Sequence, residues 1–341
     1  MSKQLVLVTG VTGFIAGQVA QSFVDAGYRV RGTVRSGKRD QVTPTEDIEF
    51  VQIDDISTAD FTEALKGVYA VIHVASPLAG RASAEETLNA AVDGTLNVLT
   101  QAEKLGITKF VVTASSADCI DYTKSATPGF ANLNFTEKDW GVTSREVAIA
   151  NAANAFFVYS ASKTLAEKAV WEFAKHHPHV DVATVLPGFV FGPYAKGYPY
   201  PSDPKVLGTM AWPFALINGG TLPVVPPWIT DVRDVAKAHV LALSLPPVAP
   251  GTNLEDKRFL INGGNYTWKE AAIHLKKVLS VELAERLTDP ASIADLPGIP
   301  STLDTTRAKA VLGLEFISPE KTLEDAVVAV AQVQKTWAQV A

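Results

Sequence analysis

Tyr159 and Lys163 are the two side chains of this 341-residue chain whose types and spacing first suggest chemistry. The residues around them, from 152 to 174, are mostly helix formers without Pro or Gly, so we expect a helix here. Residues four apart lie on the same face of a helix. A nearby ammonium group favours the phenolate and lowers a phenol pKa from its usual value of about 10. The pair therefore predicts a tyrosine that gives or takes a proton near neutral pH.

The elements that must position this pair follow a regular pattern over the first 115 residues, where short apolar runs alternate with helical patterns. Such alternation predicts a doubly wound α/β fold whose parallel sheet is buried on both faces. The expected strands cover residues 5–9, 29–34, 49–53, 70–74, 110–114, 182–186 and 258–262. The expected helices cover residues 14–26, 58–65, 85–105, 231–243, 268–279 and 322–337.

The stretch from residue 187 to 230 holds nine prolines and cannot continue this alternation. We therefore expect a Rossmann domain over residues 1–190 that carries the catalytic residues. Later segments, over about 229–262, are expected to return to it. Residues 191–341 are expected to form mainly a smaller C-terminal α/β lobe that binds substrate.

Composition excludes several classes of partner. The net charge is −6, without a long run of one sign, which argues against nucleic acid and against an anionic membrane surface. Cys119 is the single cysteine, so no internal disulfide forms and a reducing compartment is expected. The sequence shows neither a signal peptide nor an apolar run of membrane-spanning length. We expect a cytoplasmic monomer or homodimer.

Two glycines follow the first expected strand and open the first expected helix, with the spacing G-x-x-G-x-x-A. Glycine lets the backbone approach a pyrophosphate, and a helix N-terminus supplies N–H donors and a favourable dipole. No Gly-Lys-Ser/Thr follows, which disfavours a nucleoside triphosphate. The stretch predicts a dinucleotide site that comprises Gly10, Thr12, Gly13, Phe14 and Ile15.

The second expected strand ends at Arg35, and Lys38 and Arg39 follow closely. A carboxylate at this point would bind the 2′-hydroxyl of NAD, whereas arginine suits a 2′-phosphate. The sequence therefore predicts NADP(H), bound first by Arg35 with help from Lys38 or Arg39. A merely solvated basic turn is the alternative. After the third strand, Asp55 and Ile56 are expected to receive the adenine.

Six motifs, in order over residues 5 to 240, resemble those of extended short-chain dehydrogenases/reductases. The resemblance is to the dihydroflavonol-reductase-like branch, which contains fungal and yeast carbonyl, ketone and methylglyoxal reductases. The motifs are TGVTGFIA (9–16), VRGTVR (30–35), VIHVASP (71–77), VTASS (112–116), YSASKTLAE (159–167) and DVRDVA (231–236). The last hundred residues match only loosely.

The resemblance implies a role for each motif. Tyr159 would protonate the substrate carbonyl, and Lys163 would lower its pKa and bind the nicotinamide ribose. Ser116, rather than its neighbour Ser115, would hydrogen-bond the carbonyl oxygen. The other cofactor contacts that the resemblance implies are Ala75, Ser76, Pro77, Tyr159 itself, Pro187, Gly188 and Val190.

Aromatic side chains are frequent in the loops expected to cover the site, and ligand pockets are mostly apolar. We expect Phe130, Tyr194 and Trp228 to face an apolar or aromatic substrate. No metal is expected, because the histidines at 176, 177 and 179 have no acid or cysteine nearby to complete a ligand set. His73, within an apolar strand, is expected to be a hydrogen-bonded core residue.

The predicted function is NADPH-dependent reduction of an aldehyde or ketone to an alcohol, with a small-molecule carbonyl compound as the partner. A sugar-nucleotide epimerase or dehydratase, which uses the same Tyr and Lys, is one alternative, and Arg35 speaks against it because such enzymes usually hold NAD. A regulator that binds NADP without chemistry is another, and the intact Tyr159–Lys163 pair speaks against it.

Overall fold

The computed structural model describes residues 3–77, 82–249 and 251–337. A seven-stranded sheet forms its centre, in the order β10-β7-β5-β4-β1-β2-β3, and all neighbouring strands are parallel. Its strands are β1 (Leu5–Val8), β2 (Arg29–Val34), β3 (Ile48–Gln52), β4 (Val68–His73), β5 (Lys109–Thr113), β7 (Asp181–Pro187) and β10 (Arg258–Ile261). The predicted doubly wound Rossmann sheet is confirmed.

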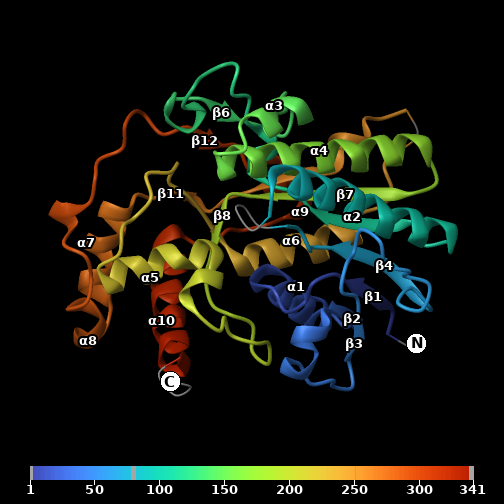
Figure 1. Cartoon of the computed structure of the whole chain (residues 1–341), viewed down its shortest axis with the longest axis horizontal. Coiled ribbons are helices and arrows are strands. Elements are labelled where there is room, and N and C mark those ends of the chain that lie inside the picture. Colours follow the sequence, from blue (N-terminus) through green and yellow to red (C-terminus); the bar gives the residue numbers. More distant parts are fainter. Residues whose placement is uncertain (1–2, 78–81, 250, 338–341) are drawn as a thin grey trace.

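Helices cover both faces of the sheet (Figure 1). On one face α1 (Phe14–Asp25) packs against α6 (Val232–Ser244), and on the other α2 (Ala84–Lys104) packs against α4 (Ala155–His176). Side chains alternate between the faces along a strand, so a strand covered on both sides needs apolar residues throughout. In β1 the two valines join the core on the α1 face and the two leucines join the core on the α4 face.

The strand order reverses at β1 and β4. From β1 the chain adds β2 and β3 on one side, and then crosses over to add β4, β5, β7 and β10 on the other. Ligands of open α/β sheets bind at such a reversal, beyond the carboxyl ends of the strands. Because all seven strands are parallel, the segments that follow β1, β2, β4, β5 and β7 meet at one edge of the sheet. Most of the predicted cofactor-binding residues, together with Ser116, lie in these segments.

A second group of elements lies at the end of the molecule away from β1, β2 and β3 (Figure 1). It contains a small sheet in the order β11-β9-β8. Its elements are β8 (Phe189–Phe191), β9 (Trp228–Asp231), β11 (Gly264–Asn265), α5 (Ala211–Asn218), α7 (Trp268–Val278), α8 (Val281–Ala284) and α10 (Pro319–Trp337). The remaining strands and helices are β6 (Asn134–Phe135), β12 (Thr302–Leu303), α3 (Arg145–Ala150) and α9 (Thr306–Leu312).

The helix expected over residues 58–65 is wrong, because this segment forms turns. The Asp55 carboxylate accepts a hydrogen bond from the N–H of Ser57, and that of Asp60 accepts one from Thr62. These side-chain bonds offer the backbone an alternative to the helix. Every other expected element is present, with ends shifted by at most three residues.

Candidate active site

The turn after β1 needs glycine at its first position. Gly10 has a φ of 69°, and a Cβ added there would lie 3.0 Å from the Cβ of Ala75. The Gly13 N–H donates to the Gly10 carbonyl at 2.9 Å, and α1 begins at the next residue. Thr12 and Ile15 flank this turn and are partly exposed. With no side-chain cap at Gly13, the first N–H groups of α1 suit an anionic ligand.

A buried hydrogen-bond chain holds the loop after β4 against this turn. Thr9 Oγ1 accepts from the N–H groups of Val74 at 2.9 Å and Ala75 at 3.0 Å, and lies 3.1 Å from His73 Nδ1. His73 Nε2 lies 3.1 Å from Thr95 Oγ1, which donates to a carbonyl of α2. Thr9 therefore donates to His73 Nδ1, and the imidazole carries its proton on Nε2. Burial, with a smaller effect of Lys163, lowers the His73 pKa to about 3, so it stays neutral. This confirms His73 as a hydrogen-bonded core residue.

The basic turn after β2 is held by a carboxylate that follows β3 in the chain. Asp54 accepts a hydrogen bond from the Ser36 N–H at 2.5 Å, which is the largest cause of its lowered pKa. Arg35 is exposed, and Lys38 donates a hydrogen bond to Gln41. The Cζ of Arg39 lies 6.0 Å from the centroid of the Phe50 ring. The turn thus presents cationic groups at the same edge of the sheet as Gly10.

Asp55 is engaged in the turn that follows β3. Its Oδ1 accepts from the N–H and the hydroxyl of Ser57, at 2.9 and 2.6 Å, and its Oδ2 accepts from Thr58 at 3.1 Å. A hydrogen bond to adenine would be added to these three. The adenine contacts expected for Asp55 and Ile56 stay predictions.

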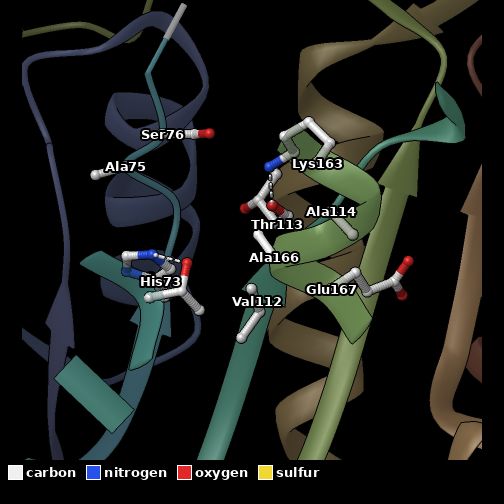
Figure 2. A pocket seen from close by; sticks show the side chains of 10 residues that line it. His73, Ala75, Ser76, Val112, Thr113, Ala114, Lys163, Ala166 and Glu167 are labelled. Carbon is white, nitrogen blue, oxygen red and sulfur yellow. Dashed lines mark hydrogen bonds between the residues drawn. The ribbon is translucent and has the colours of Figure 1, made fainter. Parts of the chain in front are cut away.

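Tyr159 and Lys163 lie one turn apart on α4. This helix begins after Asn154, whose side chain accepts from the Phe157 N–H at 3.1 Å. Lys163 is buried, and its Nζ donates to the Thr113 carbonyl at the end of β5, at 2.8 Å (Figure 2). The lysine thereby ties the helix to the carboxyl edge of the sheet.

Burial decides the proton affinity of Tyr159. It raises the pKa of Tyr159 to about 12, while a hydrogen bond with Ser115 lowers this pKa by less. The Nζ of Lys163 is directed to the Thr113 carbonyl, and the expectation that Lys163 lowers the Tyr159 pKa stays a prediction. Tyr159 is a protonated phenol at neutral pH, the form that a proton donor needs.

Of the two neighbouring serines, Ser115 is the one whose side chain lowers the Tyr159 pKa. It continues β5 in extended conformation, with φ −155° and ψ 149°, and the short helix η2 (Ser116–Cys119) begins at the next residue. The backbone therefore changes direction between the two serines. The role expected for Ser116 stays a prediction. Ser115, which the resemblance did not favour, is the alternative candidate for the same role.

Single alanine variants of the two serines should separate them. We expect Ser115→Ala to lower kcat for carbonyl reduction by about 100-fold, because it removes the donor beside Tyr159. Ser116→Ala is expected to cost less than about tenfold, and steady-state kinetics with one substrate measures both. If the larger loss falls on Ser116→Ala, the role belongs to Ser116.

A small cavity joins the ends of β4 and β5 to α4 (Figure 2). Lys163 and Ser76 reach toward it from opposite sides, whereas the Glu167 carboxylate points away from it. The residues lining it are His73, Ala75, Ser76, Thr95, Val112, Thr113, Ala114, Lys163, Ala166 and Glu167. The catalytic helix and the expected cofactor loop therefore share one enclosed space, and Pro77 continues that loop.

The segment after β7 is constrained by packing. A Cβ at Gly188 would lie 2.9 Å from the hydroxyl oxygen of Thr230 and 3.2 Å from the Cβ of Trp228, so only glycine fits. Pro187 ends β7 beside β10, while Val190 is buried in the core near α6. The cofactor contacts expected for Pro187, Gly188 and Val190 stay predictions.

A series of aromatic rings leads from Tyr159 toward the small sheet formed by β11, β9 and β8. The Phe156 ring centroid lies 6.3 Å from that of Tyr159 and 6.4 Å from that of Phe189. Phe189 lies 4.9 Å from Trp212 and 6.2 Å from Trp228, and these three rings line an apolar hollow. Sequence reasoning missed Phe189 as a pocket residue, although its place directly after the glycine was an available signal.

The three aromatics expected to face substrate lie in different surroundings. Trp228 belongs to this series, but it is only 1% exposed and its Nε1 donates to the Ser301 carbonyl at 2.8 Å. Tyr194 packs beside the glycine turn, with its ring 5.0 Å from that of Phe14. Phe130 is half-buried in the segment between β5 and β6. Their contacts with substrate stay predictions.

In the part of the chain that the structure describes, no three His, Cys, Asp or Glu side chains gather as a metal site would require. The clustered histidines bond elsewhere: His176 and His177 to carbonyls of α4, and His179 to Glu103. None of the described helices combines the length and apolar character needed to span a bilayer.

Residues 6–252 match the NAD dependent epimerase/dehydratase family. The chain belongs to this family, that of the extended short-chain dehydrogenases/reductases. An uncharacterized oxidoreductase of Schizosaccharomyces pombe is 35% identical over 95% of this chain and 96% of its own. Aldehyde reductase 2 of Sporidiobolus salmonicolor is 27% identical, with 90% and 89% covered.

Among solved structures, Gre2 from Candida albicans in its NADPH complex superposes with a TM-score of 0.81. It is 27% identical and the match covers 97% of this chain and 99% of that one. The expected resemblance to the reductases of the extended short-chain family is confirmed. The match therefore includes both the seven-stranded sheet of this chain and its second group of elements.

Proposed function

We propose that this protein is an NADPH-dependent carbonyl reductase that converts an aldehyde or ketone to an alcohol. The observation that carries the proposal is the meeting of Tyr159, Ser115 and Lys163 at the sheet edge that also holds Gly10 and Arg35. Bound NADPH would supply a hydride to the carbonyl carbon. Tyr159 then transfers its phenolic proton to the carbonyl oxygen, and a hydroxyl from the serine pair steadies the charge that develops there.

The chain offers a place for each part of that cofactor. The close approach of Gly10 to Ala75 and the uncapped start of α1 suit the pyrophosphate. Exposed Arg35 suits the 2′-phosphate. Lys163, buried on α4 with its Nζ beside the end of β5, is available to the nicotinamide ribose. The NADPH complex of Gre2 and the reductase relatives support this choice of cofactor and reaction.

The apolar hollow beside Phe189 favours an apolar or aromatic carbonyl substrate. Phe156 and Phe189 extend from the Tyr159 ring toward Trp212, so a substrate whose carbonyl meets Tyr159 can lay its side chain along these rings. Burying apolar surface supplies binding free energy at roughly 25 cal/mol per Å². Larger apolar carbonyl compounds should therefore be reduced with higher kcat/KM than small polar ones.

A panel of aldehydes and ketones, followed by the absorbance of NADPH, tests the proposal. Stoichiometric consumption of NADPH and carbonyl is the expected result. The panel should include sugar nucleotides, because an epimerase or dehydratase would convert them without net consumption of NADPH. Binding of NADPH without turnover of any compound would instead indicate a regulator.

Arg35 should decide the preference for NADPH over NADH. Arg35→Ser is expected to lower kcat/KM for NADPH by about 10- to 100-fold, because it removes a charged hydrogen bond to the 2′-phosphate. The value of kcat/KM for NADH should change little. The matched control is Arg29→Ser at the opposite end of β2, where the arginine pairs with Glu49. Equal efficiency of the original enzyme with NADH would contradict the NADP(H) assignment.

A further inference from the structure

Behind the catalytic pair lies a buried ionic cluster built around Glu167. Arg258 donates from Nε and Nη2 to the two Glu167 oxygens, each at 2.9 Å. Thr184 and Trp171 donate to Glu167 as well, at 2.6 and 3.2 Å. Arg258 is 0% exposed and Glu167 is 2% exposed. A bidentate arginine and two further donors hold Glu167 as a carboxylate.

Asp118 adds a second acid to this cluster. It is 0% exposed, and its Oδ2 accepts from the Ser115 N–H at 3.0 Å. Among the described residues, no group donates a hydrogen bond to its Oδ1. The Glu167 carboxyl group is close enough to Asp118 to raise its pKa. Two neighbouring buried carboxyl groups cannot both be ionised cheaply, and one proton shared between them satisfies both.

Several groups act on Asp118 from the surrounding elements. Burial and Glu167 raise the pKa of Asp118 above its ordinary value, while Lys163 and Arg258 oppose them. The Cys119 thiol beside it stays neutral, because burial raises its pKa too. Glu167 already has its charge matched by Arg258, so the proton belongs on Asp118.

The charge of Asp118 matters to the catalytic tyrosine. An ionised Asp118 raises the pKa of Tyr159 and so opposes loss of the phenolic proton. A neutral Asp118 removes this opposition to proton transfer from Tyr159. Through its bond to the Ser115 N–H, Asp118 also holds the serine whose side chain lowers the Tyr159 pKa.

We propose that Asp118 is a positioning residue that carries a proton, donates it from Oδ1 to Glu167, and holds Ser115 against Tyr159. This inference rests on the proposed carbonyl reduction for its kinetic consequence, but not for the location of the proton. A protonated acid presents one donor and one acceptor, and asparagine presents the same pair in nearly the same shape.

Asp118→Asn and Asp118→Ala form the kinetic test. The Asn variant should keep kcat within about threefold and an unchanged pH profile, since its amide donates to Glu167 and accepts from Ser115. The Ala variant should lose about 10- to 100-fold in kcat, because it leaves Glu167 and the Ser115 N–H without their partner. A loss in Asp118→Asn as large as in Asp118→Ala would overturn the proposal.

Infrared spectroscopy locates the proton without turnover, and it serves even if the Ala variant fails to fold. At neutral pH the original protein should show the C=O stretch of a buried protonated carboxylic acid, and Asp118→Asn should lack it. The matched control Asp121→Asn should retain it, because hydrogen bonds from Thr123 lower the Asp121 pKa. Absence of the band in the original protein would overturn the proposal. Since the band needs no substrate, this result is independent of whether the carbonyl panel succeeds.

Discussion

Tyr159→Phe is expected to lower kcat for carbonyl reduction by at least about 100-fold. The substitution keeps the ring that packs near Phe156 and removes only the hydroxyl, so folding should change little. The hydride then adds to a carbonyl whose oxygen has no positioned acid. Single-turnover kinetics with NADPH in excess measures the chemical step directly.

The pH dependence gives an independent check on this role. Because burial raises the Tyr159 pKa to about 12, the phenol stays protonated through neutral pH and the reduction rate should be flat there. The reverse oxidation needs the phenolate, whose fraction rises about tenfold per pH unit below the pKa. Near-normal turnover of Tyr159→Phe, or a reduction rate that falls through neutral pH, would contradict the assignment.

Arg258→Met should have the largest effect on stability, lowering the free energy of unfolding by about 3–5 kcal/mol. The substitution strands the buried Glu167 carboxylate without its bidentate partner. It also removes the donor to the carbonyls of Glu137 and Asp139, each 2.7 Å away, and the cation stacked 3.6 Å above the Trp140 ring. Urea unfolding of the original protein and the variant measures the change, provided that the free energy of unfolding depends on urea concentration with the same slope in both.

The matched control is Lys66→Met, which breaks the exposed pair with Glu63, whose side chains are 66% and 76% exposed. Such surface pairs contribute only about 0–1 kcal/mol. A double variant, Arg258→Met with Glu167→Leu, should recover part of the loss because no unpaired charge remains buried. If Arg258→Met lowers the free energy of unfolding no more than Lys66→Met does, the ionic cluster around Glu167 does not stabilise the fold.

The local pattern of the sequence was sufficient to predict the sheet and most of the segments at its carboxyl edge. β1 is apolar at every residue because it is covered on both faces, so its valines join one core cluster and its leucines the other. The glycine turn follows from one steric need at Gly10. Parallel strands then carry the segments after them to the same edge. The failure at residues 58–65 has a local cause too, since aspartate side chains competed with the helix.

The amino-acid sequence by itself determined that Tyr159 and Lys163 share a helix face, because spacing along a helix is local. Only the tertiary structure decided what each group does there. Burial raises the Tyr159 pKa, the Ser115 side chain lowers it by less, and Lys163 is held by the Thr113 carbonyl fifty residues away in sequence. Arg258 reaches Glu167 across 91 residues. A side chain's charge depends on the solvent it loses and the partners it gains, and both are set by packing between distant segments.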